Sequence, residues 1–351
     1  MLKLDPQPLT ILTGDCRDLL KTLRAESVHC CVTSPPYWRL RDYGHPDQIG
    51  QEPTPEKYVE ALRAVFAEVQ RVLRSDGTLW LNLGDCYASA WPCSRRNQMG
   101  NGSLPNGTRA ARAPRLGPGL KEKDLVGIPW LVAFALRQDG WYLRSDIIWH
   151  KPNTMPESVA DRPTKAHEYL FLLSKSKRYY YDAAAIREAP SQKLLKEIES
   201  GYAGNSRKDF MKAGAQDASA TKRRIIEGYR KRIDKQRGHS RRHAGFNRRW
   251  DRLSKEEQRL CGRNKRSVWT VATASYRGAH FATYPPTLIK PCVLAGCPPG
   301  GVVLDPFAGS GTTGKVALEQ GRRALLMELN SEYVNLIRER CAMIESLAFA
   351  G

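Results

Sequence analysis

The chain has 351 residues, enough for one large domain or two ordinary ones with a sizeable core. Its 56 Lys and Arg against 36 Asp and Glu give a formal net charge of +20, which favours a polyanionic partner, most simply nucleic acid. The 9 Cys include no CxxC pair, no apolar run has membrane-spanning length and the N-terminus lacks a signal-peptide pattern. These features predict a cytoplasmic protein with free thiols, without a metal site and without a membrane contact.

The first ninety residues alternate between strand and helix patterns. Residues 9–13 and 28–32 are short apolar runs, as expected of buried strands, and the second ends abruptly at Ser34-Pro35-Pro36. Apolar residues then recur at helical spacing over 58–73, and a Ser75-Asp76-Gly77 turn leads into a strand over 78–83. Strand, helix and strand joined by short turns predict a parallel, doubly wound sheet.

The middle of the chain changes character twice. Residues 90–123 are rich in Gly, Pro, Asn and Arg and predict a long mobile loop. A helix is predicted over 124–137, and strands over 141–149 and 167–173.

Residues 187–266 hold 24 Lys and Arg against 10 Asp and Glu, a net +14. Their basic clusters are interleaved with aromatic residues, so we interpret the stretch as a DNA-contacting insert, with a solvated charged region as the alternative. The arginines expected to contact DNA there are Arg223, Arg224, Arg230, Arg241, Arg242, Arg248 and Arg249.

The globular pattern resumes from Trp269. We expect a helix that opens at Tyr284-Pro285, then alternating elements up to a closing helix over 331–344. The predicted strands are 301–304 and 323–328, and a helix over 311–319 lies between them.

A Gly-rich turn joins that strand and that helix. Glycines let the backbone approach a ligand closely, and free N–H groups at a helix N-terminus can receive the carboxylate of a methionine moiety. No Lys follows at the position a phosphate loop requires, and the GxGxxG pattern is incomplete. The residues assigned to cofactor binding here are Asp305, Phe307, Gly309, Ser310, Gly311, Thr312 and Thr313.

Two acidic residues extend this candidate cofactor site. Glu328 ends the next predicted strand, about twenty residues beyond the glycines, where a carboxylate can bind ribose hydroxyls. The alternative for Glu328 is a helix N-terminal charge. Asp15 follows the first strand and is predicted either to reach an adenine amino group or to cap the next helix.

Ser34-Pro35-Pro36-Tyr37 is the candidate catalytic motif. The exocyclic amino group of cytosine or adenine is a poor nucleophile because its lone pair is delocalised into the ring. The Ser34 hydroxyl and the Pro35 carbonyl can accept its N–H bonds, and the prolines hold these acceptors in place. Tyr37 offers a ring face on which a base can stack, once that base has been flipped out of the duplex. A plain rigid turn is the alternative, disfavoured by the Gly-rich site in the same chain.

These two motifs, in this order, resemble those of the bacterial and phage DNA amino-methyltransferases in their β arrangement, over residues 9–182 and 269–346. The resemblance implies an α/β, Rossmann-like fold that binds S-adenosylmethionine. Its sheet would be mostly parallel and seven-stranded, with the last strand reversed and the order circularly permuted. It also implies a catalytic half over 1–186, a target-recognition insert over 187–266 and a cofactor half over 267–351.

The resemblance assigns further roles. Residues 280–285 match a segment that closes over the methionine moiety, so Phe281 and Tyr284 are expected at the cofactor. Arg95 and Arg96, in the loop over 90–123, are expected at DNA phosphates. Double-stranded DNA is the implied substrate and a homodimer the implied assembly, as either a restriction-modification or an orphan methylase.

The modified base is left open by these motifs. Ser at the first motif position is the usual mark of cytosine N4 enzymes in the family, so Ser34 slightly favours cytosine over adenine N6. Methylation of RNA or of a protein amide by the same chemistry is a further alternative, and a binding module without turnover is another.

Overall fold

The structure is a computed structural model of the chain. It describes residues 7–43, 45–89, 119–190, 262–273 and 284–348, and a few isolated positions between 192 and 257. The chain divides into two compact units, one made of Met1–Ala185 and Arg266–Gly351 and the other of Ile186–Lys265. All the helices and strands named below belong to the first unit.

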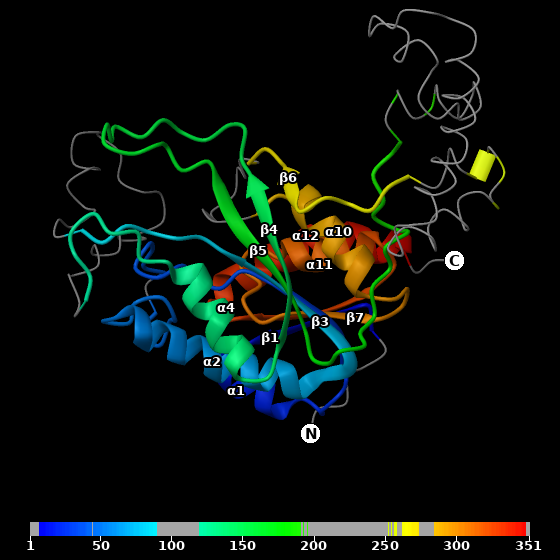
Figure 1. Cartoon of the computed structure of the whole chain (residues 1–351). Coiled ribbons are helices and arrows are strands. Elements are labelled where there is room, and N and C mark those ends of the chain that lie inside the picture. Colours follow the sequence, from blue (N-terminus) through cyan, green and yellow to red (C-terminus); the bar gives the residue numbers. More distant parts are fainter. Residues whose placement is uncertain are drawn as a thin grey trace, which may run out of the picture. The chain divides into compact units, whose positions relative to one another are not determined.

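An eight-stranded sheet runs through the first unit in the order β1-β8-β7-β2-β3-β5-β4-β6 (Figure 1). Near its centre, β2 (Val28–Thr33) pairs in parallel with β7 (Val302–Asp305), so an N-terminal and a C-terminal segment of the chain meet there. Among the described strands, only β5 (His167–Ser174) runs against its neighbours. The remaining strands are β1 (Leu9–Thr13), β3 (Leu73–Leu83), β4 (Tyr142–His150), β6 (Val268–Thr270) and β8 (Arg323–Glu328).

The mostly parallel, permuted α/β fold expected from the sequence is confirmed. Counted from β7, which precedes the cofactor loop, β5 is the seventh strand and is the reversed one. The sheet has eight strands rather than seven because β6 pairs in parallel with the edge of β4. The Ile148 N–H of β4 donates a hydrogen bond to the Ser267 carbonyl, 2.8 Å away, just before β6 begins.

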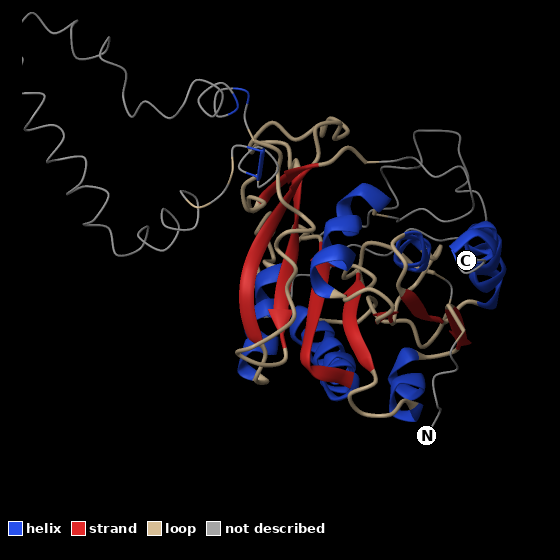
Figure 2. Ribbon diagram, turned by 90° about the vertical axis from the view of Figure 1, so that its right-hand side faces the viewer, coloured by secondary structure: helices blue, strands red, loops and turns tan. Residues whose placement is uncertain are grey.

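Helices cover both faces of the sheet (Figures 1 and 2). Cys31 of β2 joins the core cluster that contains Phe66 of α2, whereas Cys30 of β2 and Trp80 of β3 lie against Gly296 of α10. Because successive strand residues point to opposite faces, both faces are buried, which explains the uninterrupted apolar runs in the sequence. One layer comprises α1 (Cys16–Thr22), α2 (Pro55–Val72) and α4 (Ile128–Gln138), and the other α10 (Pro286–Gly296), α11 (Thr312–Glu319) and α12 (Ser331–Ala348).

Two of the element boundaries that differ from the expected ones have a clear physical cause. The helix predicted from residue 124 begins at Ile128, because Gly127 takes a φ of 81° and the Asp85 carboxylate accepts the Gly127 and Ile128 N–H groups at its start. The predicted turn at residues 75–77 instead stays within β3, where the register with β2 shifts. Both differences arise from contacts between segments, which local patterns do not encode.

In the second unit, the two ends of the segment are paired. Glu188 and Arg263 form an antiparallel bridge, and their side chains make an ion pair with 2.8 Å between Arg263 Nε and Glu188 Oε2.

The seven cysteines in the described parts of the chain are free thiols, and Cys30 and Cys31 are core residues as expected. Across those same parts, no group of three or more His, Cys, Asp and Glu side chains is placed to hold a metal ion. Among the described helices, none combines the length and apolar character needed to cross a bilayer.

Candidate active site

A cavity of about 830 Å³ opens at the carboxyl ends of β2 and β7. The chain leaves these two neighbouring strands in opposite directions across the sheet, which makes this the switch point where α/β folds bind ligands. The volume lies toward the upper end of the range for ligand pockets, about 300–1,000 Å³. Both motifs line the cavity. The lining residues among the predicted ones are Ser34, Pro35, Pro36, Tyr37, Asp15, Tyr284, Phe307, Gly309, Ser310, Thr312 and Glu328.

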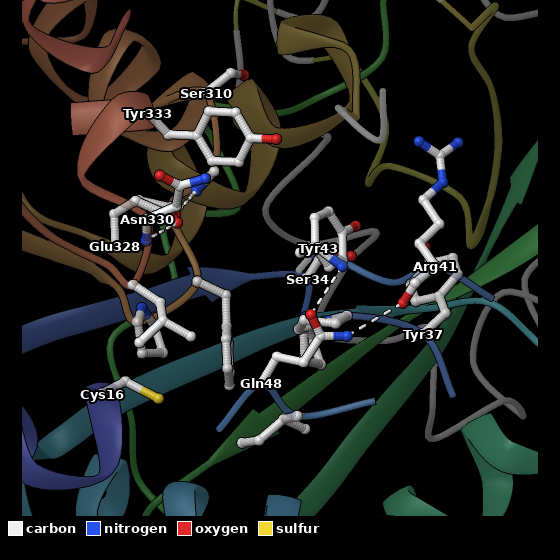
Figure 3. Close-up of a pocket in the computed structure, with 18 of the residues that line it drawn as sticks. Cys16, Ser34, Tyr37, Arg41, Tyr43, Gln48, Ser310, Glu328, Asn330 and Tyr333 are labelled. Carbon is white, nitrogen blue, oxygen red and sulfur yellow. Dashed lines mark hydrogen bonds between the residues drawn. The ribbon is translucent and has the colours of Figure 1, made fainter. Parts of the chain in front are cut away.

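The catalytic motif lies immediately beyond β2. In Figure 3, Ser34 and Tyr37 lie apart from Glu328, Asn330 and Tyr333, and all five line the one cavity. The two motifs, about 270 residues apart in the chain, therefore face a common space.

Tyr37 is held at its hydroxyl. The phenol donates to Glu168 Oε2 at 2.6 Å and accepts from Asn82 Nδ2 at 2.6 Å. Burial raises the pKa of Tyr37 well above its usual value, and the Glu168 charge adds to this, so the phenol stays protonated and remains a donor. Asn82 Nδ2 also lies 3.4 Å from Ser34 Oγ, which links the Ser and Tyr ends of the motif.

Gly84 leaves the space that the Tyr37 ring occupies. A Cβ atom on residue 84 would lie 2.4 Å from Tyr37 Cε2, and the ring cannot retreat without breaking its bonds to Glu168 and Asn82. We expect Gly84→Ala to lower the free energy of unfolding by about 1–3 kcal/mol, measured by urea denaturation. The same substitution added to a Tyr37→Ala protein should cost little more, since the clash is gone. Equal costs in both backgrounds would contradict this account.

The Asp305 carboxylate, predicted to bind the cofactor, lies behind the loop rather than in the cavity. Asp305 is 1% exposed, and its Oδ1 accepts from Thr33 Oγ1 at 2.6 Å and from the Phe307 N–H at 3.0 Å. Its Oδ2 accepts from Tyr284 at 3.1 Å and from Thr313 Oγ1 at 2.5 Å. Asp305, Gly311 and Thr313 do not line the cavity. Because its oxygens serve these four donors, Asp305 supports the loop from behind, and a direct contact of its carboxylate with the cofactor stays a prediction.

The Gly-rich loop depends on backbone conformations that favour glycine. Gly309 has a φ of 53° and Gly311 a φ of 77°, and a Cβ on residue 311 would lie 2.9 Å from Ile337 Cγ2. Gly311 is the N-cap of α11, which has no side-chain cap. The first N–H groups of α11 thus remain available at the cavity wall, where Thr312 lies.

Glu328 ends β8 with its carboxylate at the cavity. Its Oε2 accepts the Gly309 N–H at 2.7 Å and its Oε1 accepts the Asn330 N–H at 3.0 Å, which leaves a lone pair on each oxygen. Burial raises the pKa of Glu328 to about 7 despite these bonds. The Glu328 carboxylate suits the ribose hydroxyls of S-adenosylmethionine. The N-terminus of α11, which has no side-chain cap, suits the methionine carboxylate of the same cofactor.

Asp15 has the capping role that was its alternative. It is the N-cap of α1, where Oδ1 accepts the Arg17 N–H at 2.8 Å, and its carboxylate pairs with the Arg17 guanidinium. Burial opposes ionisation, but the Arg17 hydrogen bonds and charge outweigh it and hold the pKa of Asp15 below its usual value. Asp15 still lines the cavity, so its contact with adenine stays a prediction.

Several expected site residues lie outside the described residues. They are Phe281 and the arginines assigned to DNA, namely Arg95, Arg96, Arg223, Arg224, Arg230, Arg241, Arg242, Arg248 and Arg249.

Sequence reasoning missed several lining residues, among them the segment after Glu328 with Asn330 and Tyr333, and two further groups. One is the segment after the catalytic motif, in which Gln48 Oε1 accepts from the Tyr43 N–H and Gln48 Nε2 donates to the Arg41 carbonyl (Figure 3). The other comes from β3, β5 and the carboxyl end of β4 with the residue after it, and it is linked to Tyr37 through Asn82 and Glu168. Its members are Asn82, Trp149, Lys151 and Glu168. A polar Asn within the apolar run over 78–83 was the one local signal for this second group.

Known proteins with solved structures share this fold. The cytosine-N4-specific PvuII DNA methyltransferase matches with a TM-score of 0.56 at 16% identity, covering 97% of this chain and 93% of its own. The Thermus thermophilus protein TTHA0409, complexed with S-adenosyl-L-methionine, matches with a TM-score of 0.50 at 22% identity, covering 97% and 96%. At these identities, the likeness concerns the fold alone.

Sequence relatives are much more similar. The type II methyltransferase M.Cfr9I of Citrobacter freundii is 43% identical over 331 residues, 94% of this chain and 87% of the relative. M.SmaI of Serratia marcescens is 42% identical over 330 residues, 94% and 89% respectively. The N6_N4_Mtase family model, described as DNA methylase, matches residues 28–339. The chain with this two-motif cavity therefore belongs to the N6/N4 DNA methylase family and is a DNA methyltransferase.

Proposed function

We propose that this enzyme transfers a methyl group from S-adenosylmethionine to N4 of a cytosine flipped out of duplex DNA. The observation that carries the proposal is the single cavity lined by both Ser34-Pro35-Pro36-Tyr37 and the Gly309–Thr312 loop. When bound, the cofactor supplies an electrophilic methyl group. The choice of cytosine rests on Ser34, which stands where the family's adenine enzymes usually carry an acidic or amide residue.

The catalytic motif orients the nucleophile. The Ser34 hydroxyl and the Pro35 carbonyl accept the two N–H bonds of the amino group, which directs its lone pair toward the methyl donor. Tyr37 stacks on the base, and its ring is already fixed by Glu168 and Asn82. The methylated amine is acidic and loses its proton without a dedicated strong base.

The cofactor end of the cavity holds S-adenosylmethionine by three kinds of contact. Glu328 accepts the ribose hydroxyls, the N-terminus of α11 receives the methionine carboxylate, and the Phe307 and Tyr284 side chains supply ring surface. Asp305 and Thr313 keep the loop in place from behind.

The raised pKa of Glu328 gives this contact a pH dependence. Only the ionised carboxylate accepts fully from two ribose hydroxyls, and a pKa of about 7 leaves a minor fraction ionised at pH 6 and most at pH 8. We expect cofactor affinity, measured by calorimetry, to rise about tenfold from pH 6 to pH 8. Glu328→Gln should bind the cofactor more weakly, and its affinity should change less with pH. The pH dependence that remains in this variant reports the titration of the cofactor itself. Parallel profiles in the two proteins would contradict the assignment.

The remaining parts of the proposal concern DNA. Duplex DNA binds through the basic stretch 187–266 and through residues 90–123, and the target base leaves the stack at a cost of roughly a few kcal/mol. We also propose that the enzyme works as a homodimer in the bacterial cytoplasm. Light scattering coupled to gel filtration tests the dimer.

The test of the function is direct. Purified protein is incubated with S-adenosylmethionine and varied duplex DNA, and the nucleosides are then identified by mass spectrometry. N4-methylcytosine is the expected product. N6-methyladenine would overturn the base assignment, and methylation of competing RNA in preference to DNA would overturn the substrate assignment.

A further inference from the structure

Lys151 and Glu168 form an ion pair on the cavity wall, and the catalytic steps above give Lys151 no role. The Lys151 and Glu168 side chains are only 18% and 14% exposed, and both line the cavity. Lys151 Nζ also lies over the Trp149 ring, 4.4 Å from the ring centroid. Sheltering two charges costs desolvation free energy that apolar residues would not cost, which points to a use in ligand recognition.

Glu168 ties the Lys151 ammonium to the catalytic motif. Its Oε1 accepts from Lys151 Nζ, and its Oε2 accepts from the Tyr37 hydroxyl at 2.6 Å and from Asn82 Nδ2 at 3.0 Å. The ammonium is therefore fixed just beyond the hydroxyl end of the Tyr37 ring.

The proposed pose of the base places its far edge at this point. The amino group is held at Ser34 and Pro35, near the backbone end of Tyr37, and the base ring overlies the phenol ring. The edge opposite the amino group then extends toward the hydroxyl end, where Lys151 lies. This step rests on the proposed function, because it takes the stacked pose as given.

Lys151 has hydrogen-bonding capacity to spare. An ammonium carries three N–H donors, and within the described part of the chain Glu168 is the sole hydrogen-bond acceptor of Nζ. The face of Trp149 attracts the cation without accepting a conventional hydrogen bond. A donor therefore remains for an acceptor on the base.

Cytosine offers that acceptor and adenine does not. When the amino-bearing carbons are superposed, cytosine presents the carbonyl O2 at the position where adenine presents a C–H group. We infer that Lys151 donates a hydrogen bond to the O2 atom of the target cytosine and so selects cytosine over adenine, while Glu168 positions the ammonium. An adenine would leave a desolvated N–H without an acceptor, which disfavours its binding.

The test is a cycle of two enzymes and two substrates. The second substrate carries a 2-aminopyridine C-nucleoside at the target position, which keeps the amino group and ring nitrogen but has C–H in place of the carbonyl. At pH 8.5, wild-type kcat/KM should fall by about 10–100-fold on this analogue. On cytosine, the kcat/KM of Lys151→Met should be lower than that of the wild type by the same factor. On the analogue, Lys151→Met should lose little more, so the ratio of its kcat/KM on cytosine to that on the analogue approaches one.

Controls separate recognition from a structural role. Lys57→Met removes a lysine from the Lys57–Glu60 ion pair on the outer surface of α2 and should keep the wild-type ratio. If Lys151→Met does not fold, the double variant Lys151→Met/Glu168→Gln avoids an unpaired carboxylate and should give the same collapsed ratio. A Lys151 variant that is slower on both substrates yet keeps the wild-type ratio would overturn the inference. Wild-type transfer to adenine instead would overturn it while leaving amino-methyl transfer to DNA intact, and no transfer to any DNA would overturn the proposed function itself.

Discussion

Ser34→Ala is expected to lower kcat for methyl transfer by about 10²–10³-fold, the loss typical when one preorganised polar group at a reacting centre is removed. The alanine lacks the hydroxyl that accepts one amino N–H bond, so the lone pair of the base is directed less well. Ser34 Oγ lies 3.4 Å from Asn82 Nδ2, and this long contact contributes little to the fold. Cofactor affinity and the melting temperature should therefore stay near the wild-type values.

Single-turnover methyl transfer under saturating cofactor isolates this step from product release. Ser27→Ala is the matched control, since Ser27 precedes the other end of β2 and its hydroxyl donates to the Arg24 carbonyl, at 2.7 Å. The control should keep wild-type kcat. An unimpaired Ser34→Ala enzyme would show that the Pro35 carbonyl suffices, and the two-acceptor account of the motif would then be wrong.

The strands and the convergence of the two motifs could be predicted because their signals are local. Residues 28–32 and 301–304 are apolar on nearly every position, as expected when helices cover both faces of a parallel sheet. Each run is followed at once by polar, Gly- or Pro-containing sequence, which marks the carboxyl end of a strand. The carboxyl ends of parallel strands meet at one edge of a sheet, so two such sequences predict one site.

The partners of Tyr37 could not be predicted, because they depend on which strands are neighbours. Asn82 of β3 and Glu168 of β5 bond to the Tyr37 hydroxyl, and Lys151, which directly follows β4, bonds to Glu168. Only the order β3-β5-β4 in the folded sheet brings these three residues together. Locally, Glu168 is one charged residue near the start of an apolar run. Its role follows from the antiparallel pairing of β5 with β3, which places Tyr169 opposite Leu83 and so brings Glu168 to the end of the sheet that bears the motif.

Asp305 shows how a correct motif assignment can give an incomplete account of one residue. The sequence places it at the start of the cofactor loop, and there it lies. Its burial could not be predicted, because Thr33, Tyr284 and Thr313 are distant in the chain or on other elements. A carboxylate that accepts from three hydroxyl groups and one backbone N–H is a structural centre for both motifs.

Asp305→Ala is accordingly expected to lower the free energy of unfolding by about 2–4 kcal/mol, because it leaves buried donors without an acceptor. Thr33 immediately precedes Ser34, and Thr313 lies in the first turn of α11, so both the catalytic motif and the cofactor loop lose support. Urea denaturation measures the stability, and calorimetry measures cofactor affinity, which should also fall.

Asp305→Asn distinguishes lost hydrogen bonds from lost charge. Burial raises the pKa of Asp305, so keeping this carboxyl ionised in the folded protein costs free energy that an amide does not cost. The amide also keeps nearly the same volume and one acceptor oxygen, which can still accept from Thr33 and from the Phe307 N–H. The hydroxyls of Tyr284 and Thr313, which bond to Oδ2 of Asp305, can rotate to accept from the NH₂ group of the asparagine. We therefore expect Asp305→Asn to be clearly more stable than Asp305→Ala. If the two variants were equally destabilised, the negative charge itself would be what the two motifs require, and the hydrogen-bond account of Asp305 would fail.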